Sequence, residues 1–584
     1  MILEGPVTVL KIDLESSSWR LEEREDLIAW LGGVGIATQL FLEEAVWDKP
    51  PLAPEQPIIF AIGPLSGVYP LATKVVAVFR SPLTEEWGES YAGMRAAIAL
   101  RFAGYNAVVI KGKAPRPTYL VIDEKGVAFR DARGVWGLDT EETGRLLREF
   151  EGGRGRRSIW RIGPAGENLV PLAGVNVDTY RHFGRLGLGA LLGSKNLKAL
   201  VVLGNRSYPI KNPAAYNRMY EKIYRAVVGT PLLSKYHYIG TAENILTLNA
   251  QGSLPTLNLR ASRFEKAEEV SGERFGRESL FRILACAGCP LGCIHVGVYR
   301  RPHPKGAGYI STTLAYDYEP IYALGPMLGL DAVDKVYALL REVEASGLDV
   351  ISTGVALAWA TEALERGIIT EKETLLPLRF GAVEGYVQAA RYLAQPPNDF
   401  YRALGRGLRY ATRVYGGEDF ALILGGHEMA GYHTGYAFLL GQSVGARHSH
   451  LCNAGYSFDQ TRKGNYTPEE LVQYLLEEEA WRNVLNSLVI CLFARKVYTP
   501  ETTAEALRAL GWEAVDPQKL LTLGRKIMRQ KWEAKKRLGY TPENLPLPPK
   551  RYFETPSGQG LLNPETYSAL LKLYRERLAS WLNV

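Results

Sequence analysis

GNRSYPIKNP (residues 204–213) divides the sequence into two parts of different character. The segment is rich in Gly, Pro, Asn and Ser, which favour turns and loops, so it predicts a domain boundary. Before it, short apolar runs are bounded by Gly, Pro or charged residues, as β-strands usually are. After it, apolar residues recur at helical spacing. We therefore expect an α+β fold, with a β-rich N-terminal domain over residues 1–208 and mainly α-helical domains after it.

The expected strands all lie in the first part. They are Val7–Asp13, Ile58–Ile62, Val75–Phe79, Ala107–Lys111, Thr118–Ile122 and Ala199–Leu203, with helices expected at Glu23–Leu31 and Arg95–Phe102. The helices expected in the second part are Ala214–Val228, Ala332–Ser346, Val355–Arg366, Pro468–Leu476 and Pro564–Trp581. A less distinct break at the Gly-rich turn 416–426 divides this part into two domains, residues 209–420 and 421–584.

Composition excludes several classes of protein. The net charge of +7 over 584 residues gives only a weak bias toward an acidic partner. No long Lys/Arg run occurs, so we expect no nucleic-acid partner. No run of 18 apolar residues and no signal peptide is evident, so we expect neither a membrane span nor secretion. These features predict a cytoplasmic protein.

Three of the five cysteines are packed into the segment LACAGCPLGCIHVG (284–297). Cys286, Cys289 and Cys293 form the pattern C-x2-C-x3-C, whose thiolates can reach three corners of one [4Fe–4S] cluster. The expected fourth ligand is Cys491 in NSLVICLFARK (486–496), and Cys452 is the competitor. Clustered thiols in a cytosolic protein indicate metal or redox work rather than a disulfide framework.

Two other interpretations of these cysteines fit the sequence less well. A zinc site using the three thiols and His295 is chemically sound, but the spacing fits compact zinc modules poorly. Radical-SAM enzymes use the reverse order, C-x3-C-x2-C. Three unliganded core cysteines would rarely lie so close together. The pattern therefore predicts a cluster protein and leaves the reaction open.

A Gly-rich, basic segment precedes the boundary, RHFGRLGLGALLGSKNLK (181–198). Its glycines permit a bulky ligand to approach the backbone, and Arg181 and Arg185 can supply paired donors to phosphate. A Gly-rich turn leading into a strand explains the segment equally well. The glycine spacing matches a dinucleotide-binding site poorly.

Several segments taken in order resemble the aldehyde:ferredoxin oxidoreductase family of tungsten-pterin, iron–sulfur enzymes, over nearly the whole chain. They are IFAIGPLSGVYP (59–70), SPLTEEWGESYAG (81–93), RFAGYNAVVIKGKA (101–114), IGPAGENLV (162–170), GRLGLGALLGSKNLKAL (184–200), CAGCPLGC (286–293), YEPIYALGPMLGLD (318–331) and GLDVISTG (347–354).

The resemblance implies a metal held by the dithiolene sulfurs of two pterins and by no protein side chain, so tungsten and molybdenum stay open. The N-terminal domain would cradle this bis-pterin, and a Mg²⁺ ion can bridge the pterin phosphates in such a site. Implied contacts are Lys74, Tyr91, Ala92, Gly93, Arg181, His182, Gly184 and Arg185. Two pterin-binding motifs would supply Glu344, Leu348 and Asp349, and then Asn486 and Ile490, directly before Cys491.

The proposed acid–base residue of the family corresponds to Glu319, with Asp317 as the fallback. Considered alone, Glu319 before Pro320 would be a carboxylate at a helix start. The active-site histidine falls in GARHSHLCNAGYS (445–457), where His448 and His450 both fit. We favour His450.

The resemblance implies oxidation of an aldehyde to the carboxylic acid, an activity of the EC 1.2.7 type. Electrons would pass through the cluster to ferredoxin or to an iron–sulfur partner subunit. Two alternatives stay open: the tungsten subunit of a low-potential reductase of the aryl-CoA type, and an electron-transfer or scaffold iron–sulfur subunit without pterin. The sequence leaves open whether the protein is a homodimer or a hetero-oligomer, and which aldehyde it uses.

Overall fold

The structure is a computed structural model that describes residues 5–153, 156–208, 210–303, 305–545 and 547–583. Its N-terminal part holds two six-stranded sheets, with strand orders β2-β1-β6-β3-β4-β5 and β11-β10-β9-β12-β7-β8. The strands of the first sheet are β1 (Val7–Asp13), β2 (Ser18–Arg24), β3 (Ile58–Ala61), β4 (Val75–Arg80), β5 (Trp87–Ala92) and β6 (Ala107–Lys111). Those of the second are β7 (Thr118–Asp123), β8 (Gly126–Asp131), β9 (Arg157–Arg161), β10 (Val175–Val177), β11 (Arg181–Phe183) and β12 (Leu197–Leu203).

The two sheets share one apolar core. Phe60 of β3 in the first sheet contacts Trp160 and Phe183 of the second, with ring centroids 4.9 and 5.5 Å apart. Both sheets are mixed: β1 runs parallel to β6 and β7 parallel to β12, while their other pairs are antiparallel. Several of these strands are buried on both faces and carry continuous apolar runs, which makes them recognisable in the sequence.

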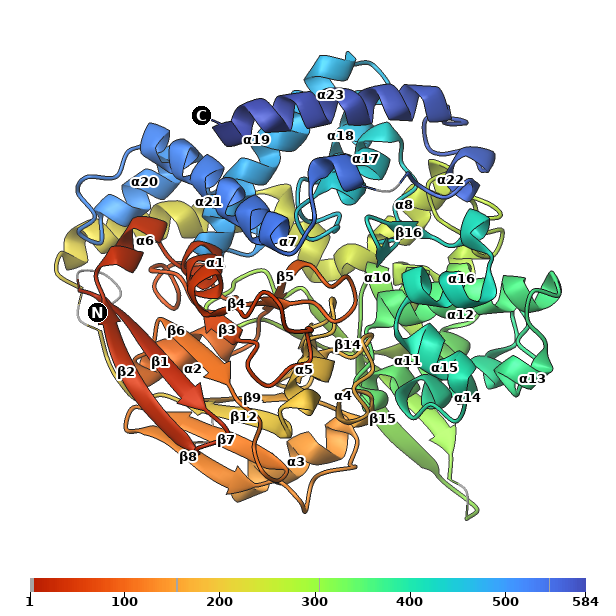
Figure 1. The fold of residues 1–584 in the computed structure, drawn as a ribbon, viewed down its shortest axis with the longest axis horizontal. Coiled ribbons are helices and arrows are strands. Elements are labelled where there is room, and N and C mark those ends of the chain that lie inside the picture. Colours follow the sequence, from red (N-terminus) through yellow and green to blue (C-terminus); the bar gives the residue numbers. More distant parts are fainter. Residues whose placement is uncertain (1–4, 154–155, 209, 304, 546, 584) are drawn as a thin grey trace.

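Helices dominate the rest of the chain (Figure 1). Five helices lie among the strands of the first part: α1 (Gly33–Glu44), α2 (Ala96–Ala103), α3 (Thr140–Phe150), α4 (Pro164–Glu167) and α5 (Leu188–Ser194). The next are α6 (Pro213–Val228), α7 (Pro231–Tyr238), α8 (Asn244–Ala250), α9 (Gly272–Ser279), α10 (Tyr318–Leu324), α11 (Val333–Ser346), α12 (Val350–Glu365), α13 (Glu371–Thr374), α14 (Val383–Ala394), α15 (Asp399–Gly405) and α16 (Leu408–Tyr415). The last are α17 (Tyr436–Val444), α18 (Gly455–Arg462), α19 (Pro468–Ser487), α20 (Pro500–Arg508), α21 (Pro517–Arg537), α22 (Arg551–Glu554) and α23 (Pro564–Asn583).

The fold class predicted from the sequence, a β-sheet N-terminal domain followed by helical domains, is confirmed. One expected helix is wrong: Glu23–Leu31 begins inside strand β2 and continues as a 3-10 turn at Asp26–Trp30. Each residue of β2 pairs with one of β1, and this ladder overrides the helical preference of Glu, Arg and Leu. The domain limits near residues 208 and 420 stay predictions.

A three-stranded antiparallel sheet lies inside the mainly helical part and was not expected. It consists of β13 (Leu280–Leu284), β14 (Ile294–Pro302) and β15 (Tyr309–Tyr316). In Figure 1 the β14–β15 hairpin extends beyond the neighbouring helices at the lower right. A short ladder of β16 (Ile423–Leu424) and β17 (His427–Glu428) follows later. Among the described residues, no helix is both long and apolar enough to cross a membrane.

Close glycine contacts bring the N-terminal sheet against the end of α19. A Cβ atom on Gly63 would lie 2.6 Å from the carbonyl oxygen of Ser487, so only glycine fits there. Beyond this contact, the backbone amide of Cys491 donates to the carbonyl of Leu71 (2.8 Å), and that of Lys74 donates to the carbonyl of Val489 (3.1 Å). The segment around Cys491 is thereby fixed beside the segment that follows β3.

Candidate active site

Three cysteines occupy the connection between β13 and β14. The amide of Met94, just after β5, donates to the Cys286 sulfur (3.2 Å), and the amide of Ala287 donates to the carbonyl of Met94 (2.9 Å). Cys289 and Cys293 pack in the same apolar cluster as Cys491, and Cys286 packs beside Cys289 and Cys293. The structure therefore brings the four predicted cluster ligands together as free thiols.

Cys452 lies apart from this group. It is buried against Gly445, where an added Cβ would meet the Cys452 Cβ at 2.6 Å. Burial raises the pKa of the Cys452 thiol, and the Glu479 carboxylate adds to this effect. The geometry thus separates Cys491 from its competitor, which the sequence alone left open.

Two cations flank the four thiols. Burial opposes the charge on Lys74 and on Arg181, but nearby thiol groups raise the pKa of both side chains. Burial raises the pKa of the Cys289 thiol to about 12, and Cys491 adds to the rise. Four sulfur ligands of an iron–sulfur cube carry negative charge, so adjacent cations and backbone N–H donors fit such a group.

The zinc interpretation gains no support from the structure. His295 Nε2 lies 2.9 and 3.2 Å from the backbone carbonyls of His237 and Tyr238, and is committed to them. Among the residues placed by the structure, no group of three or more His, Cys, Asp or Glu side chains is arranged to hold a single metal ion. A cube of four iron atoms requires its thiols farther apart than one ion does.

Arg185 joins the end of the N-terminal part to the start of α12. Its Nη2 donates to the carbonyl of Glu428 (2.8 Å), and its Nε donates to Asp349 Oδ2 (3.4 Å). Asp349 also accepts the amide of Ser352 (3.0 Å), which caps α12. This arrangement places one residue of the first predicted pterin motif beside the basic, Gly-rich segment.

The other predicted pterin contacts fall into two groups. His182 Nε2 lies 2.7 Å from Glu344 Oε2, and Leu348 pairs with Ala173 in an isolated bridge. Asn486 and Ile490 are buried at the end of α19, directly before Cys491. Gly184 is open, since an added Cβ would meet only Asp349 Oδ1, at 3.9 Å.

At the end of β5, the residues that the resemblance implies as pterin contacts are already packed or hydrogen-bonded within the chain. A Cβ on Gly93 would lie 2.7 Å from the Cys286 sulfur and 3.1 Å from Lys74 Nζ, so this position requires glycine. Ala92 ends the strand against Val75. The Tyr91 hydroxyl is already committed, because it donates to Glu89 Oε2 (3.0 Å).

Three buried nitrogens in this interior have no hydrogen-bond partner among the described residues: Arg185 Nη1, His427 Nε2 and His450 Nδ1. Burial lowers the pKa of both histidines, and the Arg185 charge lowers it further, so the three side chains share one region. Buried polar atoms are almost always paired in folded proteins. A large polar or anionic group, such as a pterin with its phosphate, therefore fits the residues present.

Glu319 and His450 meet beside this region. His450 Nε2 lies 3.6 Å from Glu319 Oε1, and the Tyr432 hydroxyl donates to the same oxygen (3.0 Å). Burial raises the pKa of Glu319, but His450 and Tyr432 outweigh it and the net shift is downward. The Tyr432 ring stacks on Tyr456, with centroids 4.6 Å apart.

His448 and Asp317, the alternatives for the active-site histidine and the acid–base residue, have other partners. His448 Nδ1 lies 2.8 Å from the Ser443 carbonyl, and its Nε2 lies 3.2 Å from Glu86 and 3.3 Å from Lys535 Nζ. Asp317 lies 3.6 Å from Arg181, and burial raises its pKa to about 6. The structure therefore brings His450, and not His448, to Glu319.

Sequence reasoning missed two residues of the site. Tyr432 is 113 residues from Glu319 and belongs to no motif that would reveal it. His427 lies in GGHEMAGYH (425–433), which lacks the spacing of a zinc motif. Its concentration with three other histidines within 24 residues was the only available signal.

Family models match most of the chain. The N-terminal domain of aldehyde ferredoxin oxidoreductase matches residues 9–204, and domains 2 and 3 of the same enzyme match residues 218–579. The tungsten-containing aldehyde ferredoxin oxidoreductase of Pyrococcus furiosus is 30% identical over 575 residues, which cover 94% of this chain and 92% of that protein. The aliphatic sulfonate oxidoreductase WOR-like subunit of the same organism is 29% identical over 66% of this chain and 64% of that subunit.

A solved structure shares the fold. The active site complex BamBC of benzoyl coenzyme A reductase, in complex with 1,5 dienoyl-CoA, superposes with a TM-score of 0.83. The match covers 98% of this chain and 94% of that chain at 19% sequence identity, a likeness that shows the fold alone. The two family models and the 30% identity across almost the full length place the chain in the aldehyde ferredoxin oxidoreductase family of tungsten oxidoreductases.

Proposed function

We propose that this protein oxidises an aldehyde to a carboxylic acid at a tungsten or molybdenum bis-pterin centre and passes the electrons through a [4Fe–4S] cluster. The observation that carries the proposal is the meeting of Glu319, His450 and Tyr432 beside unpartnered interior nitrogens. A partly buried carboxylate that contacts two donors, next to a histidine with an unpartnered ring nitrogen, is an arrangement suited to acid–base catalysis.

Residues from both parts of the chain would hold the cofactors. Arg185, Asp349 and His182 would contact one pterin, and Asn486 and Ile490 the other, while Cys286, Cys289, Cys293 and Cys491 would bind the cluster. Arg181 and Lys74 would balance the negative charge of the four cysteine thiolates. When bound, the metal would supply the two-electron oxidation, and a Mg²⁺ ion could join the pterin phosphates.

Glu319 would accept the proton that the reaction releases, and His450 would orient the attacking water. Because His450 and Tyr432 lower its pKa, Glu319 is ionised at neutral pH and can accept a proton as water adds to the carbonyl carbon. With Nε2–H directed at the ionised Glu319, neutral His450 has Nδ1 as an acceptor without a protein partner, and Nδ1 can accept a hydrogen bond from the attacking water.

The electron path would be short. Cys491 follows directly on Ile490 of the second pterin motif, so one peptide bond would separate a pterin contact from a cluster ligand. The electrons would leave the cluster for ferredoxin or for an iron–sulfur partner subunit.

The test is Glu319→Gln in the holoprotein, with Asp317→Asn as the matched control. We expect Glu319→Gln to reduce aldehyde-dependent viologen reduction by about 10²- to 10⁴-fold, because the proton acceptor is removed, while tungsten and iron contents stay unchanged. Asp317→Asn should retain most of the rate. Activity that survives Glu319→Gln would overturn the assignment.

Two further measurements separate the alternatives. Tungsten or molybdenum, with two pterins per chain, would exclude a scaffold subunit without pterin. Reduction of an aryl-CoA thioester in place of aldehyde oxidation would instead identify a low-potential reductase.

A further inference from the structure

The β13–β15 sheet leads directly away from the cysteine loop. β13 ends at Leu284 and β14 begins at Ile294, so the connection between them holds Cys286, Cys289 and Cys293. In Figure 1 the β14–β15 hairpin extends from there beyond the neighbouring helices. One structural unit therefore links the candidate cluster site to the surface.

The pairing register defines the two faces of this sheet. Arg282 pairs with Val296, Val298 with Thr313, and Arg300 with Ser311. Because side chains alternate along a strand, Arg282, Val296, Val298 and Arg300 lie on one face, which we name the cluster-side face. At its base, Ile294 and Val296 pack on Cys286. The opposite face packs on the helical core, where Tyr299 approaches the Tyr337 ring at 6.1 Å.

The charge of this unit is entirely positive. Residues 280–316 contain Arg282, Arg300, Arg301 and Lys305 but no Asp or Glu. Arg282 and Arg300 are exposed. In a chain with 62 acidic residues, a stretch of this length without a carboxylate is a local electrostatic feature that attracts acidic surfaces.

Exposed aromatic side chains accompany the positive charge. Tyr309, which pairs with Pro302 near the tip, is 72% exposed, and Phe281 is 56% exposed. The Arg282 guanidinium lies over the Phe281 ring, 4.8 Å from its centroid. Tyr, Phe and Arg are the residue types enriched in protein–protein interfaces.

We propose that the cluster-side face of β13–β15 is the docking surface for the protein that accepts electrons from this chain, and that this acceptor presents an acidic surface. The proposal rests on the proposed function, because it requires a redox-active cluster at the four cysteines. Val296 is buried against Cys286, Met94 and Tyr180, and the exposed Arg300 follows four residues later, about 13 Å along the strand. A partner seated here would lie against the edge of the cluster site. One electron would pass per encounter, oxidising the cluster and reducing the acceptor, with no bond broken.

The experiment uses reduced holoprotein and an acidic [4Fe–4S] ferredoxin as probe, so that no organic substrate is needed. Stopped-flow spectroscopy would follow cluster reoxidation by ferredoxin in the wild type and in the variant R282E/R300E/K305E. We expect the variant's rate at low ionic strength to fall at least about tenfold, and the wild-type rate to fall as salt is added. Reoxidation by methyl viologen, which needs no docking surface, should be unchanged.

A matched variant, R413E/K463E/K572E, removes the same charge from exposed positions on α16, after α18 and on α23. It should keep the ferredoxin rate within about twofold. Equal losses in the two variants would show a general charge effect and overturn the docking assignment, as would an unaffected rate in R282E/R300E/K305E.

Binding of dye-labelled ferredoxin, measured by fluorescence anisotropy, distinguishes this failure from failure of the proposed function. If purified protein lacks iron, the proposed function fails, whereas the affinities of the two triple variants still test the surface. A loss of self-association in R282E/R300E/K305E with unchanged ferredoxin affinity would identify the face as a contact between copies and overturn the proposal.

Discussion

Burial raises the pKa of Glu319 and His450 lowers it; the hydroxyl of Tyr432, which donates to Glu319 at 3.0 Å, lowers it further. Tyr432→Phe keeps the ring stacked on Tyr456 but removes this donor. The Glu319 pKa should therefore rise, and the acidic limb of the kcat/KM profile should move to higher pH. Tyr456→Phe, which leaves the hydrogen bond intact, is the control. An unshifted profile in Tyr432→Phe would disprove this role, even if the rate at neutral pH fell.

The sequence could predict some residues of this site and not others. Cys286, Cys289 and Cys293 have a recognisable spacing, whereas Glu319 followed only from the family resemblance and Cys491 had Cys452 as a competitor. His448 and His450 cannot be separated by sequence, because they are two residues apart in one irregular loop. The structure separates them through their partners: His448 has a left-handed backbone (φ 54°) and contacts Glu86, whereas His450 faces Glu319. Tyr432 could not be predicted, since its role depends on a tertiary contact.

At the level of elements, helix α21 is held against strand β5 by buried ion pairs. Lys535 Nζ lies 2.5 Å from Glu86 and Lys531 Nζ lies 2.9 Å from Glu89, and all four side chains are at most 4% exposed. This network also contains His448, so it fixes the loop that carries His450. Replacing one partner of a buried pair leaves an uncompensated charge.

Glu86→Gln tests this network. Burial opposes the Glu86 charge, but Lys535 and His448 lower its pKa to about 2, below the value of about 4.3 expected in the unfolded chain. The ionised carboxylate therefore stabilises the fold above pH ~4.5, and this stabilisation is lost as the pH falls toward 2. We expect Glu86→Gln to lower the free energy of unfolding by about 3 kcal/mol at pH 7. The further loss of stability on acidification should be smaller in the variant than in the wild type, as measured by thermal unfolding from pH 7 to 2. Asp399→Asn, at the exposed pair with Arg402, should cost under about 1 kcal/mol. Parallel acid profiles in Glu86→Gln and the wild type would contradict this account.

Prediction at this scale succeeded where local signals were strong. The strands around Val75 and Ala107 were readable because both of their faces are buried apolar positions. β13–β15 was missed because its arginines and the intervening cysteines interrupt any strand pattern, and because the hairpin is held together by pairing between β14 and β15. α19 was predicted only to Leu476, because its last turns, to Ser487, are buried on several sides and lose the amphipathic spacing.

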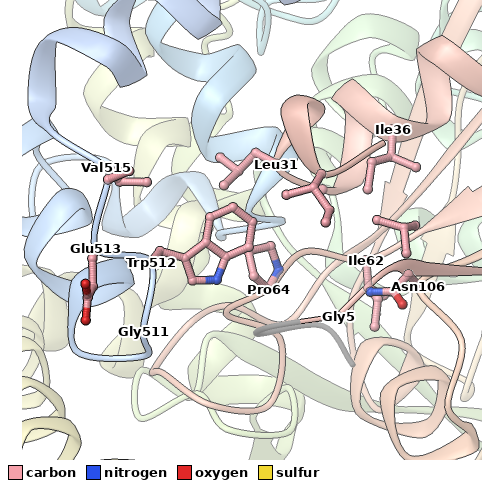
Figure 2. A pocket seen from close by; sticks show the side chains of 14 residues that line it. Gly5, Leu31, Ile36, Ile62, Pro64, Asn106, Gly511, Trp512, Glu513 and Val515 are labelled. Atoms are coloured by element: carbon pink, nitrogen blue, oxygen red, sulfur yellow. The ribbon is translucent and has the colours of Figure 1, made fainter. Parts of the chain in front are cut away.

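At the scale of the whole molecule, a surface cleft opens between the two parts of the chain, beside the contacts of Gly32 and Gly63 with the end of α19. Its volume is about 410 Å³, and Ile36 and Ile62 of the N-terminal part face Trp512 and Val515 of the C-terminal part (Figure 2). The two parts are therefore incompletely packed on this side. Their tighter junction is the contact of Gly63 with the end of α19, next to the cysteine site.

This arrangement predicts that the cluster stabilises the assembly of the whole chain. Cys293 and Cys491 are roughly two hundred residues apart in the sequence, so a shared cluster closes a long loop and restricts the unfolded chain, by up to about 5 kcal/mol. Cys491→Ser should lose most of the iron and lower the melting temperature by several degrees. Cys452→Ser changes a thiol that is more buried than Cys491 but lies outside the cysteine group, and it should keep both iron and stability. Iron analysis and thermal unfolding of the two variants measure this difference. If Cys452→Ser lost iron and Cys491→Ser kept it, the fourth ligand would be Cys452, and the path from the second pterin motif to the cluster would have no basis.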